Sequence, residues 1–108
     1  MTVSLPTSIA DYFSLSNGEA GVGVEDCFTD DALVADEHQQ HRGTAAIQSW
    51  LDHTRAQYDF QTVPLRMLAD GDRTVVHARV TGNFPGGEVE LAFAFVLQAA
   101  KIRRLDIQ

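Results

Sequence analysis

The sequence has one cysteine, no long hydrophobic run and no basic leader, and each shortage excludes a class of protein. The lone Cys27 cannot form a disulfide within the chain, and acidic neighbours at residues 25, 26, 30 and 31 disfavour a reactive thiolate, so we expect a buried core thiol. The longest apolar stretch, residues 91–97, is far shorter than the roughly 20 residues that cross a bilayer. Residues 1–13 lack the features of a signal peptide. We therefore expect a cytoplasmic protein without a membrane partner.

Positive charge is also scarce. The chain of 108 residues has 8 Lys and Arg against 15 Asp and Glu, a net charge of −7. Nucleic-acid binding needs clustered basic residues that displace counterions from phosphates, and the one basic cluster, residues 101–104, is interrupted by Ile102. No nucleic acid is expected as a partner. The length and the absence of linkers or repeats indicate a single domain over residues 1–108.

Apolar residues recur at helical spacing in the first half of the chain. The pattern predicts a first helix that ends at Asn17-Gly18, a shorter second helix, and a third that begins at Gly43-Thr44. Residues 32–36 predict a short strand after a break at residues 29–31, and residues 37–42 predict a turn or a second small strand. The buried stripes of the three helices are predicted at Ile9, Tyr12 and Phe13, at Val24, Cys27 and Phe28, and at Ile47, Trp50, Leu51 and Thr54.

From residue 60 onward the apolar residues alternate, which indicates strands. Residues 62–68, 74–83, 88–97 and 102–107 are the predicted strands, separated by turns at residues 70–72, 85–87 and 99–100. Val76 alternates with His77 and Arg79, so the latter two are expected on the outer face of the sheet. Helices followed by an antiparallel meander with one apolar face predict an α+β fold, with three helices from the N-terminal half packed on one side of a curved, mostly antiparallel sheet.

Two polar residues interrupt the apolar pattern. Asp36 ends the first predicted strand, where partial burial would raise the pKa of its carboxyl toward the range of a general base. A solvated aspartate that ends a strand is the plainer interpretation. Tyr12 lies on the buried stripe of the first helix, where its hydroxyl needs a partner or water. It could equally be a core tyrosine bonded to a backbone carbonyl.

The order of elements and two local strings point to one family. The strings are DDALVAD at residues 30–36 and RGTAAI at residues 42–47. Together they resemble the NTF2-like superfamily, and within it the SnoaL-like and ketosteroid isomerase-like proteins, over nearly the whole chain. The resemblance implies a cone-shaped, NTF2-like (cystatin-like) α+β barrel in which the curved sheet wraps around a helix and leaves an apolar pocket.

The resemblance also assigns roles to individual residues. Asp36 matches the catalytic base of the isomerase, and Tyr12 matches its oxyanion-hole tyrosine; enolate chemistry of this kind uses an aspartate base and a tyrosine donor. The isomerase has a second, protonated aspartic acid on a late strand, and Phe93 is its nearest equivalent here. No cofactor is implied. The substrate-binding walls are expected to be Trp50, Val76, Phe93 and Phe95.

Histidines near Asp36 offer further roles. The spacing Asp36-x-His38-x-x-His41 matches possible metal ligands, but three such residues in a polar turn are more often solvated, and we expect no metal site. His38 and His41 remain possible accessory residues that move a proton at the pocket mouth. The outer sheet face, with His77 and Arg79, could form a homodimer, as it often does in NTF2-like proteins.

Two functions follow from this interpretation. The first is an isomerase, cyclase or dehydratase that transfers a proton on a small hydrophobic carbonyl compound. The alternative is a module of the same fold that binds a small molecule or dimerises without catalysis. A third option resembles the limonene epoxide hydrolases, but it needs an Asp-Arg-Asp set inside the pocket, and Arg79 and Asp106 are expected to point away from it.

Overall fold

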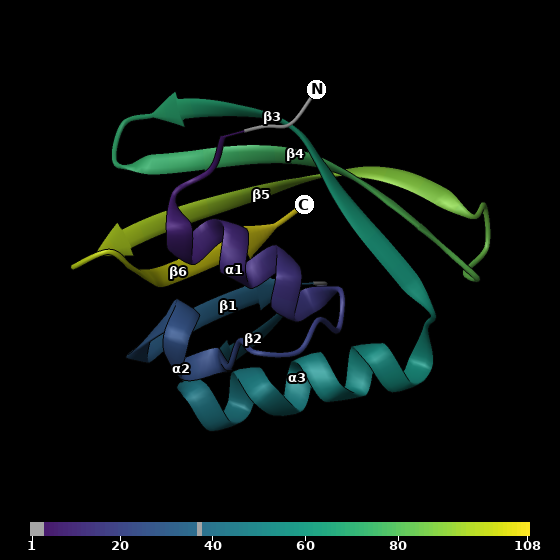
Figure 1. The fold of residues 1–108 in the computed structure, drawn as a ribbon, viewed down its shortest axis with the longest axis horizontal. Helices are drawn as coiled ribbons and strands as arrows, with labels where there is room; N and C mark the ends of the chain where they lie inside the picture. The colour runs from purple at the N-terminus through teal and green to yellow at the C-terminus, as the bar shows by residue number, and fades with distance from the viewer. Residues whose placement is uncertain (1–3, 37) are drawn as a thin grey trace.

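Six strands form one sheet, and three helices accompany them in the part of the chain that the computed structural model describes, residues 4–36 and 38–108 (Figure 1). The helices stand in the first half of the chain, as the sequence predicts. The elements in chain order are α1 (Thr7–Ser16), α2 (Val24–Cys27), β1 (Phe28–Asp36), β2 (Gln39–Arg42), α3 (Thr44–Gln57), β3 (Phe60–Asp70), β4 (Arg73–Gly82), β5 (Glu88–Gln98) and β6 (Lys101–Ile107).

The sheet is mostly antiparallel and strongly curved. Its strand order is β2-β1-β6-β5-β4-β3, and only the pair β1–β6 runs parallel. Figure 1 shows α1 lying in the hollow of the curved sheet, while α3 runs beside β1 and β2. The predicted α+β class and the packing of three helices on one curved sheet are therefore confirmed.

The first strand begins earlier than its sequence suggests. Residues 29–31 were expected to break the pattern, but they belong to β1, and Phe28 is its first residue instead of part of the helical stripe. The strand pairs with β6 at Phe28–Ile102 and again from Leu33–Arg104, with a register shift between. This irregularity turns Asp30 and Asp31 to solvent, which hides the alternation that would have marked a strand.

The core lies between α1, α2 and the inner face of the sheet. Five aromatic rings pack there, mostly edge to face, with Tyr12 and Phe13 of α1 against Phe28, Phe93 and Phe95, at centroid separations from 5.2 to 6.3 Å. Cys27 is fully buried beside them, as predicted. Burial, and then the charges of Asp11 and other nearby acids, raises the pKa of its thiol to about 12, so the sulfur stays protonated.

One glycine fixes how α3 leaves the β1–β2 hairpin. Gly43 has φ +90° and ψ 157°, a conformation that L side chains rarely adopt, and its amide donates to the carbonyl of Ala32 at 2.8 Å. The amide of Ile47 in turn donates to the Gly43 carbonyl, which starts the helix. This turn sets the direction of α3, and α3 carries Trp50 toward the end of β1.

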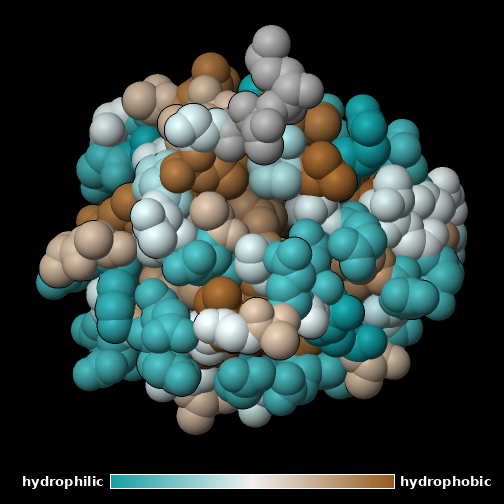
Figure 2. All heavy atoms as spheres, in the orientation of Figure 1, coloured by the Kyte–Doolittle hydropathy of each residue, from teal (hydrophilic) through white to brown (hydrophobic). Residues whose placement is uncertain are grey.

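The surface gives little sign of an extended apolar patch on the face drawn in Figure 2, where hydrophobic residues show in small separate groups among hydrophilic ones. Within residues 4–36 and 38–108, no helix is long and apolar enough to cross a membrane.

Candidate functional site

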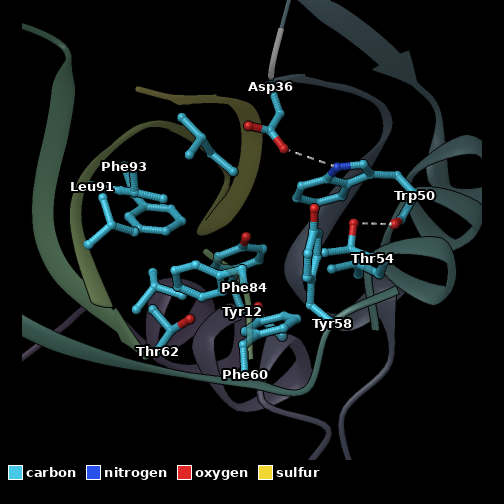
Figure 3. Close-up of a pocket in the computed structure, with 15 residues that line it drawn as sticks. Tyr12, Asp36, Trp50, Thr54, Tyr58, Phe60, Thr62, Phe84, Leu91 and Phe93 are labelled. Atoms are coloured by element: carbon cyan, nitrogen blue, oxygen red, sulfur yellow. Dashed lines mark hydrogen bonds between the residues drawn. The ribbon is translucent and has the colours of Figure 1, made fainter. Parts of the chain in front are cut away.

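A cavity of about 310 Å³ opens at the end of the sheet that α1 leaves uncovered (Figure 3). Aromatic and aliphatic side chains make up most of its wall, and Asp36 is the only acidic residue among the described residues that line it. We call it the central cavity. It is lined by Tyr12, Ser16, Asp36, Trp50, Leu51, Thr54, Tyr58, Phe60, Thr62, Val80, Phe84, Val89, Leu91, Phe93 and Ile107.

Asp36 reaches this cavity because of its place in β1. Val34 is fully buried on the inner face, and side chains two residues apart share a face, so Asp36 also points inward at the strand's end. The indole Nε1 of Trp50, from α3, donates to Asp36 Oδ2 at 3.3 Å. The carboxylate is half-buried at the edge of the cavity, between Trp50 on one side and Leu91 and Phe93 on the other (Figure 3).

Tyr12 lines the same cavity from α1 and is only 1% exposed. Burial raises the pKa of its hydroxyl far above the ordinary value, the negative charge of Asp36 raises this pKa further, and a hydrogen bond with Ser16 acts in the opposite direction. The Asp36 carboxylate therefore lies close enough for its charge to act on the phenol. Because the hydroxyl keeps its proton, Tyr12 can serve as a hydrogen-bond donor in the cavity.

Trp50 connects Asp36 to a residue of the neighbouring strand. The imidazole of His41, in β2, stacks on the indole with centroids 5.7 Å apart and planes 26° apart. His41 Nε2 is buried and makes no hydrogen bond among the described residues. The Thr54 hydroxyl, one turn after Trp50, donates to the Trp50 carbonyl at 2.8 Å and lines the cavity as well.

Two of the four expected wall residues lie elsewhere. Trp50 and Phe93 line the cavity, but Val76 and Phe95 are fully buried in the core and are not part of its lining. Three of the four are strand residues, Val76, Phe93 and Phe95, and the alternation predicts one shared apolar face for them, which the register confirms by pairing Val76 with Phe93. The difference arises because α1 covers the part of that face near Phe95, with the Tyr12 and Phe95 rings 5.7 Å apart.

The uncovered part of the face contributes walls that the sequence did not single out. Val80, Val89 and Leu91 continue the same alternation toward the other end of β4 and β5, so the strand pattern could have identified them. Phe84 comes from the loop between these strands and has no such pattern. Its ring approaches Gly82 so closely that a Cβ there would meet both Phe84 and the Asp59 carbonyl, at 3.0 and 2.6 Å.

The floor of the cavity is tied to the end of α1. The Asn17 side chain accepts from the Thr62 amide at 2.8 Å and donates to the Thr62 carbonyl at 2.9 Å, so it pairs with β3 as a strand would. Thr62 is buried and lines the cavity with Phe60. The guanidinium of Arg55 lies 5.4 Å from the centre of the Phe60 ring and donates to the Ser16 carbonyl. These contacts connect α1, α3 and β3 around the site.

His38 lies in a second hollow, the polar groove, which shares Asp36, Leu91 and Ile107 with the central cavity. Its volume is about 690 Å³, and the described residues that line it are Ala35, Asp36, His38, Gln39, Gln40, Leu91, Asp106, Ile107 and Gln108. His38 thus lines the polar groove, whereas His41 packs on Trp50. Among the described residues, no group of three or more His, Cys, Asp or Glu side chains is placed to hold a metal ion.

Several charged residues of strands β3 to β6 lie on the outer face of the sheet. Glu90 accepts from Arg66 at 2.7 Å and lies 3.7 Å from His77, while Arg79 lies 3.9 Å from Glu88. Asp106 pairs with Arg104 on the same face. Neither Arg79 nor Asp106 lines the central cavity, so the Asp-Arg-Asp set of the epoxide hydrolase option is not assembled there.

The buried phenol of Tyr12 makes stability depend on pH. An unfolded tyrosine ionises near pH 10, whereas Tyr12 in the folded chain keeps its proton to higher pH. The folded state therefore binds more protons above about pH 10, and the free energy of unfolding should fall there by up to about 1.4 kcal/mol per pH unit. Urea unfolding between about pH 9 and 11 tests this. Tyr12→Phe should reduce the slope by that amount, whereas Tyr58→Phe should leave the contribution in place.

Comparisons with known proteins agree on one kind of fold. The model of the SnoaL-like domain family matches residues 9–104. The structure of a candidate polyketide cyclase from Sinorhizobium meliloti is 33% identical, with a TM-score of 0.87, over 96% of this chain and 95% of the other. No curated protein sequence matches.

Two further structures are each 16% identical in sequence to this chain, and at that identity the likeness shows a common fold only. One is a candidate SnoaL-like polyketide cyclase from Jannaschia sp. CCS1, with a TM-score of 0.80 over 94% of this chain and 82% of the other. The other, from Catenulispora acidiphila, has a ketosteroid isomerase-like fold and was crystallised with trimethylamine; its TM-score is 0.82 over 97% of this chain and 86% of that one.

Proposed function

The chain belongs to the SnoaL-like domain family, and from this premise we propose that it is an isomerase, cyclase or dehydratase that transfers a proton on a small hydrophobic carbonyl compound. Asp36 is the base and Tyr12 the hydrogen-bond donor in this proposal. The observation that carries it is the meeting of these two groups in one largely apolar cavity, where the charge of Asp36 acts on the Tyr12 hydroxyl.

The proposed step moves one proton and one electron pair. The Asp36 carboxylate removes a proton from the carbon next to the carbonyl, and the electrons of that C–H bond pass through the new C=C bond to the carbonyl oxygen. The neutral Tyr12 hydroxyl stabilises the resulting enolate oxygen by a hydrogen bond. When the ketone has a second double bond conjugated with the enolate, protonated Asp36 returns the proton to the far end of that double bond. The enolate electron pair re-forms the C=O bond and the C=C bond moves by one position, which gives the isomer. An apolar wall favours this step because it replaces water by fixed side chains.

The size of the cavity suggests the size of the substrate. An apolar cavity of about 150 Å³ holds one benzene ring, and the central cavity is about 310 Å³. One or two rings therefore fit within it, with the carbonyl directed toward Asp36 and Tyr12. Phe60, Phe84 and Phe93 would contact the rings (Figure 3).

Hydrogen–deuterium exchange tests the proposal without knowledge of the natural substrate. One- and two-ring ketones, such as cyclohexenones and tetralones, are incubated with the protein in D₂O, and deuterium at the carbon next to the carbonyl is followed by NMR. We expect at least one ketone to exchange faster than in buffer alone, and Tyr12→Phe to lower that rate by about 10²–10³-fold. If no ketone in the series exchanges above the buffer rate, the proposal fails.

A binding protein without turnover is the second candidate. Phe93 supports this candidate: the resemblance makes it the nearest equivalent of the second oxyanion donor of the isomerases, and its side chain supplies only apolar wall to the cavity. Loss of one such donor typically lowers a rate by about 10²–10³-fold. Tight binding of two-ring ligands in the cavity, with no exchange or other conversion, would support this candidate over catalysis.

We further propose that the outer sheet face forms a homodimer. By register Val63 lies opposite Arg79 and Leu68 opposite Val75, on the face that carries the strand charges, and both apolar side chains are more than half exposed, at 52% and 54%. Exposed apolar residues beside paired charges are typical of association surfaces. Light scattering should give twice the chain mass of 11.8 kDa, and Leu68→Asp should restore the single mass. A single mass in the unmodified protein would exclude this dimer.

A further inference from the structure

Three groups from two neighbouring parts of the fold meet behind the proposed base. Asp36 ends β1, His41 belongs to β2, and Trp50 belongs to the second turn of α3. The antiparallel register of the β1–β2 hairpin places His41 opposite Val34, and Val34 shares the inner face with Asp36. The hairpin thus presents a carboxylate and an imidazole to the same indole.

The contacts with that indole are of two kinds. Its Nε1 edge donates to Asp36 Oδ2 at 3.3 Å, while one of its faces is stacked by the His41 ring at 26° between planes. His41 Nε2 is buried and makes no hydrogen bond among the described residues. This nitrogen therefore does not help to fix the orientation of the ring through a polar contact with them. Packing against Trp50 is therefore one contact that holds the imidazole in its position.

We propose that His41 and Trp50 form a positioning pair for Asp36. The imidazole fixes the plane of the indole, and the fixed indole keeps its N–H on one carboxylate oxygen. A hydrogen bond to the charged form of a carboxylate favours ionisation, so the pair counteracts the effect of the apolar cavity and keeps Asp36 ready to accept a proton. Neither residue touches the reacting atoms in this role. The catalytic role of the pair rests on the proposed function, whereas the positioning of Asp36 by Trp50 and His41 does not depend on it.

The chain offers a direct probe, because Trp50 is its only tryptophan and its indole N–H gives a single ¹H–¹⁵N resonance. We expect this resonance to shift with pH as Asp36 titrates, between about pH 3 and 6, and to lose that shift in Asp36→Asn. Among the described residues, other titratable groups around Asp36 are Tyr12 of α1, Tyr58 just after α3, His41 of β2, and His38 and Asp106 in the polar groove. The measurement is therefore repeated in His41→Phe, which keeps a stacked ring without an ionisable group.

Two further variants separate positioning from general packing. Trp50→Phe keeps a ring but lacks the N–H, and should raise the pKa of the Asp36 carboxyl, followed by ¹³C NMR, by about one unit. His41→Leu fills the space without a flat ring, and should speed hydrogen exchange of the indole N–H by about tenfold relative to His41→Phe. His41→Ala serves the same purpose if the leucine variant does not fold.

An indole resonance that does not respond to Asp36, or equal exchange in the phenylalanine and leucine variants at position 41, would overturn the proposal. These readouts need no substrate, so they also distinguish its failure from failure of the proposed function. A coupled titration without ketone exchange would retain the pair and reject the enzyme. If a ketone exchanges deuterium but the indole resonance does not respond to Asp36, the enzyme is retained and the pair is rejected.

Discussion

Asp36→Asn is expected to lower the rate of deuterium exchange into an accepted ketone by about 10²–10⁴-fold, the usual contribution of a general base. Asparagine has nearly the same shape and can still accept a hydrogen bond from Trp50 Nε1, which lies 3.3 Å from Asp36 Oδ2, but it cannot accept the substrate's proton. The fold should therefore persist while the chemistry is lost. Initial rates at a fixed ketone concentration, with circular dichroism of each variant, give the comparison.

The matched control is Asp72→Asn, which changes the same functional group in the exposed turn between β3 and β4. It should leave the exchange rate within about twofold of the unmodified protein, since surface substitutions rarely act at a distance. Equal rates in Asp36→Asn and the unmodified protein would remove Asp36 from the reaction. Equal losses in both variants would show that the effect is one of overall charge.

Phe95→Ala is expected to lower the free energy of unfolding by about 3–5 kcal/mol, the usual cost of truncating a buried aromatic ring. Phe95 is fully buried, and its ring lies 5.7 Å from that of Tyr12 and 6.0 Å from that of Phe13. The substitution leaves a cavity beneath α1, where packed rings cannot collapse to fill it. Urea unfolding followed by circular dichroism measures the change.

Met67→Ala provides the comparison for this variant, because Met67 is 39% exposed in β3 and, paired with Val76, lies off the proposed dimer face. Its loss should cost less than about 1 kcal/mol in the monomer. A change below about 1 kcal/mol in Phe95→Ala as well would contradict the assignment of Phe95 to the core. It would instead agree with the expectation, drawn from alternation alone, that Phe95 lines a hollow.

Strand alternation and helical spacing were sufficient to predict most elements of this fold, because each buries one apolar face. They failed at residues 29–31, where the register shift in β1 turns Asp30 and Asp31 outward and imitates a loop. The parallel pairing of β1 with β6 was also beyond the pattern. It depends on which strands meet in space, and alternation within each strand carries no information about that.

The apolar pattern of the sequence also predicted part of the candidate site. Tyr12 and Asp36 stood out as polar residues in apolar surroundings, and both line the central cavity. The pattern could not say where α1 ends on the sheet, so it gave Phe95 the same role as Phe93. The donation from Trp50 to Asp36 was missed as well, because an apolar stripe indicates that an indole is buried but not where its N–H points.

Binding of a phenol that imitates the enolate, such as 2-naphthol, tests most directly whether Asp36 and Tyr12 act on one ligand in the cavity. Asp36→Asn should bind the ionised phenol at least about tenfold more tightly, because it removes a negative charge beside the ligand's oxygen. Tyr12→Phe should bind it about 10–100-fold more weakly, because it removes a hydrogen bond to a charged group. The same dissociation constant in all three proteins would contradict the account.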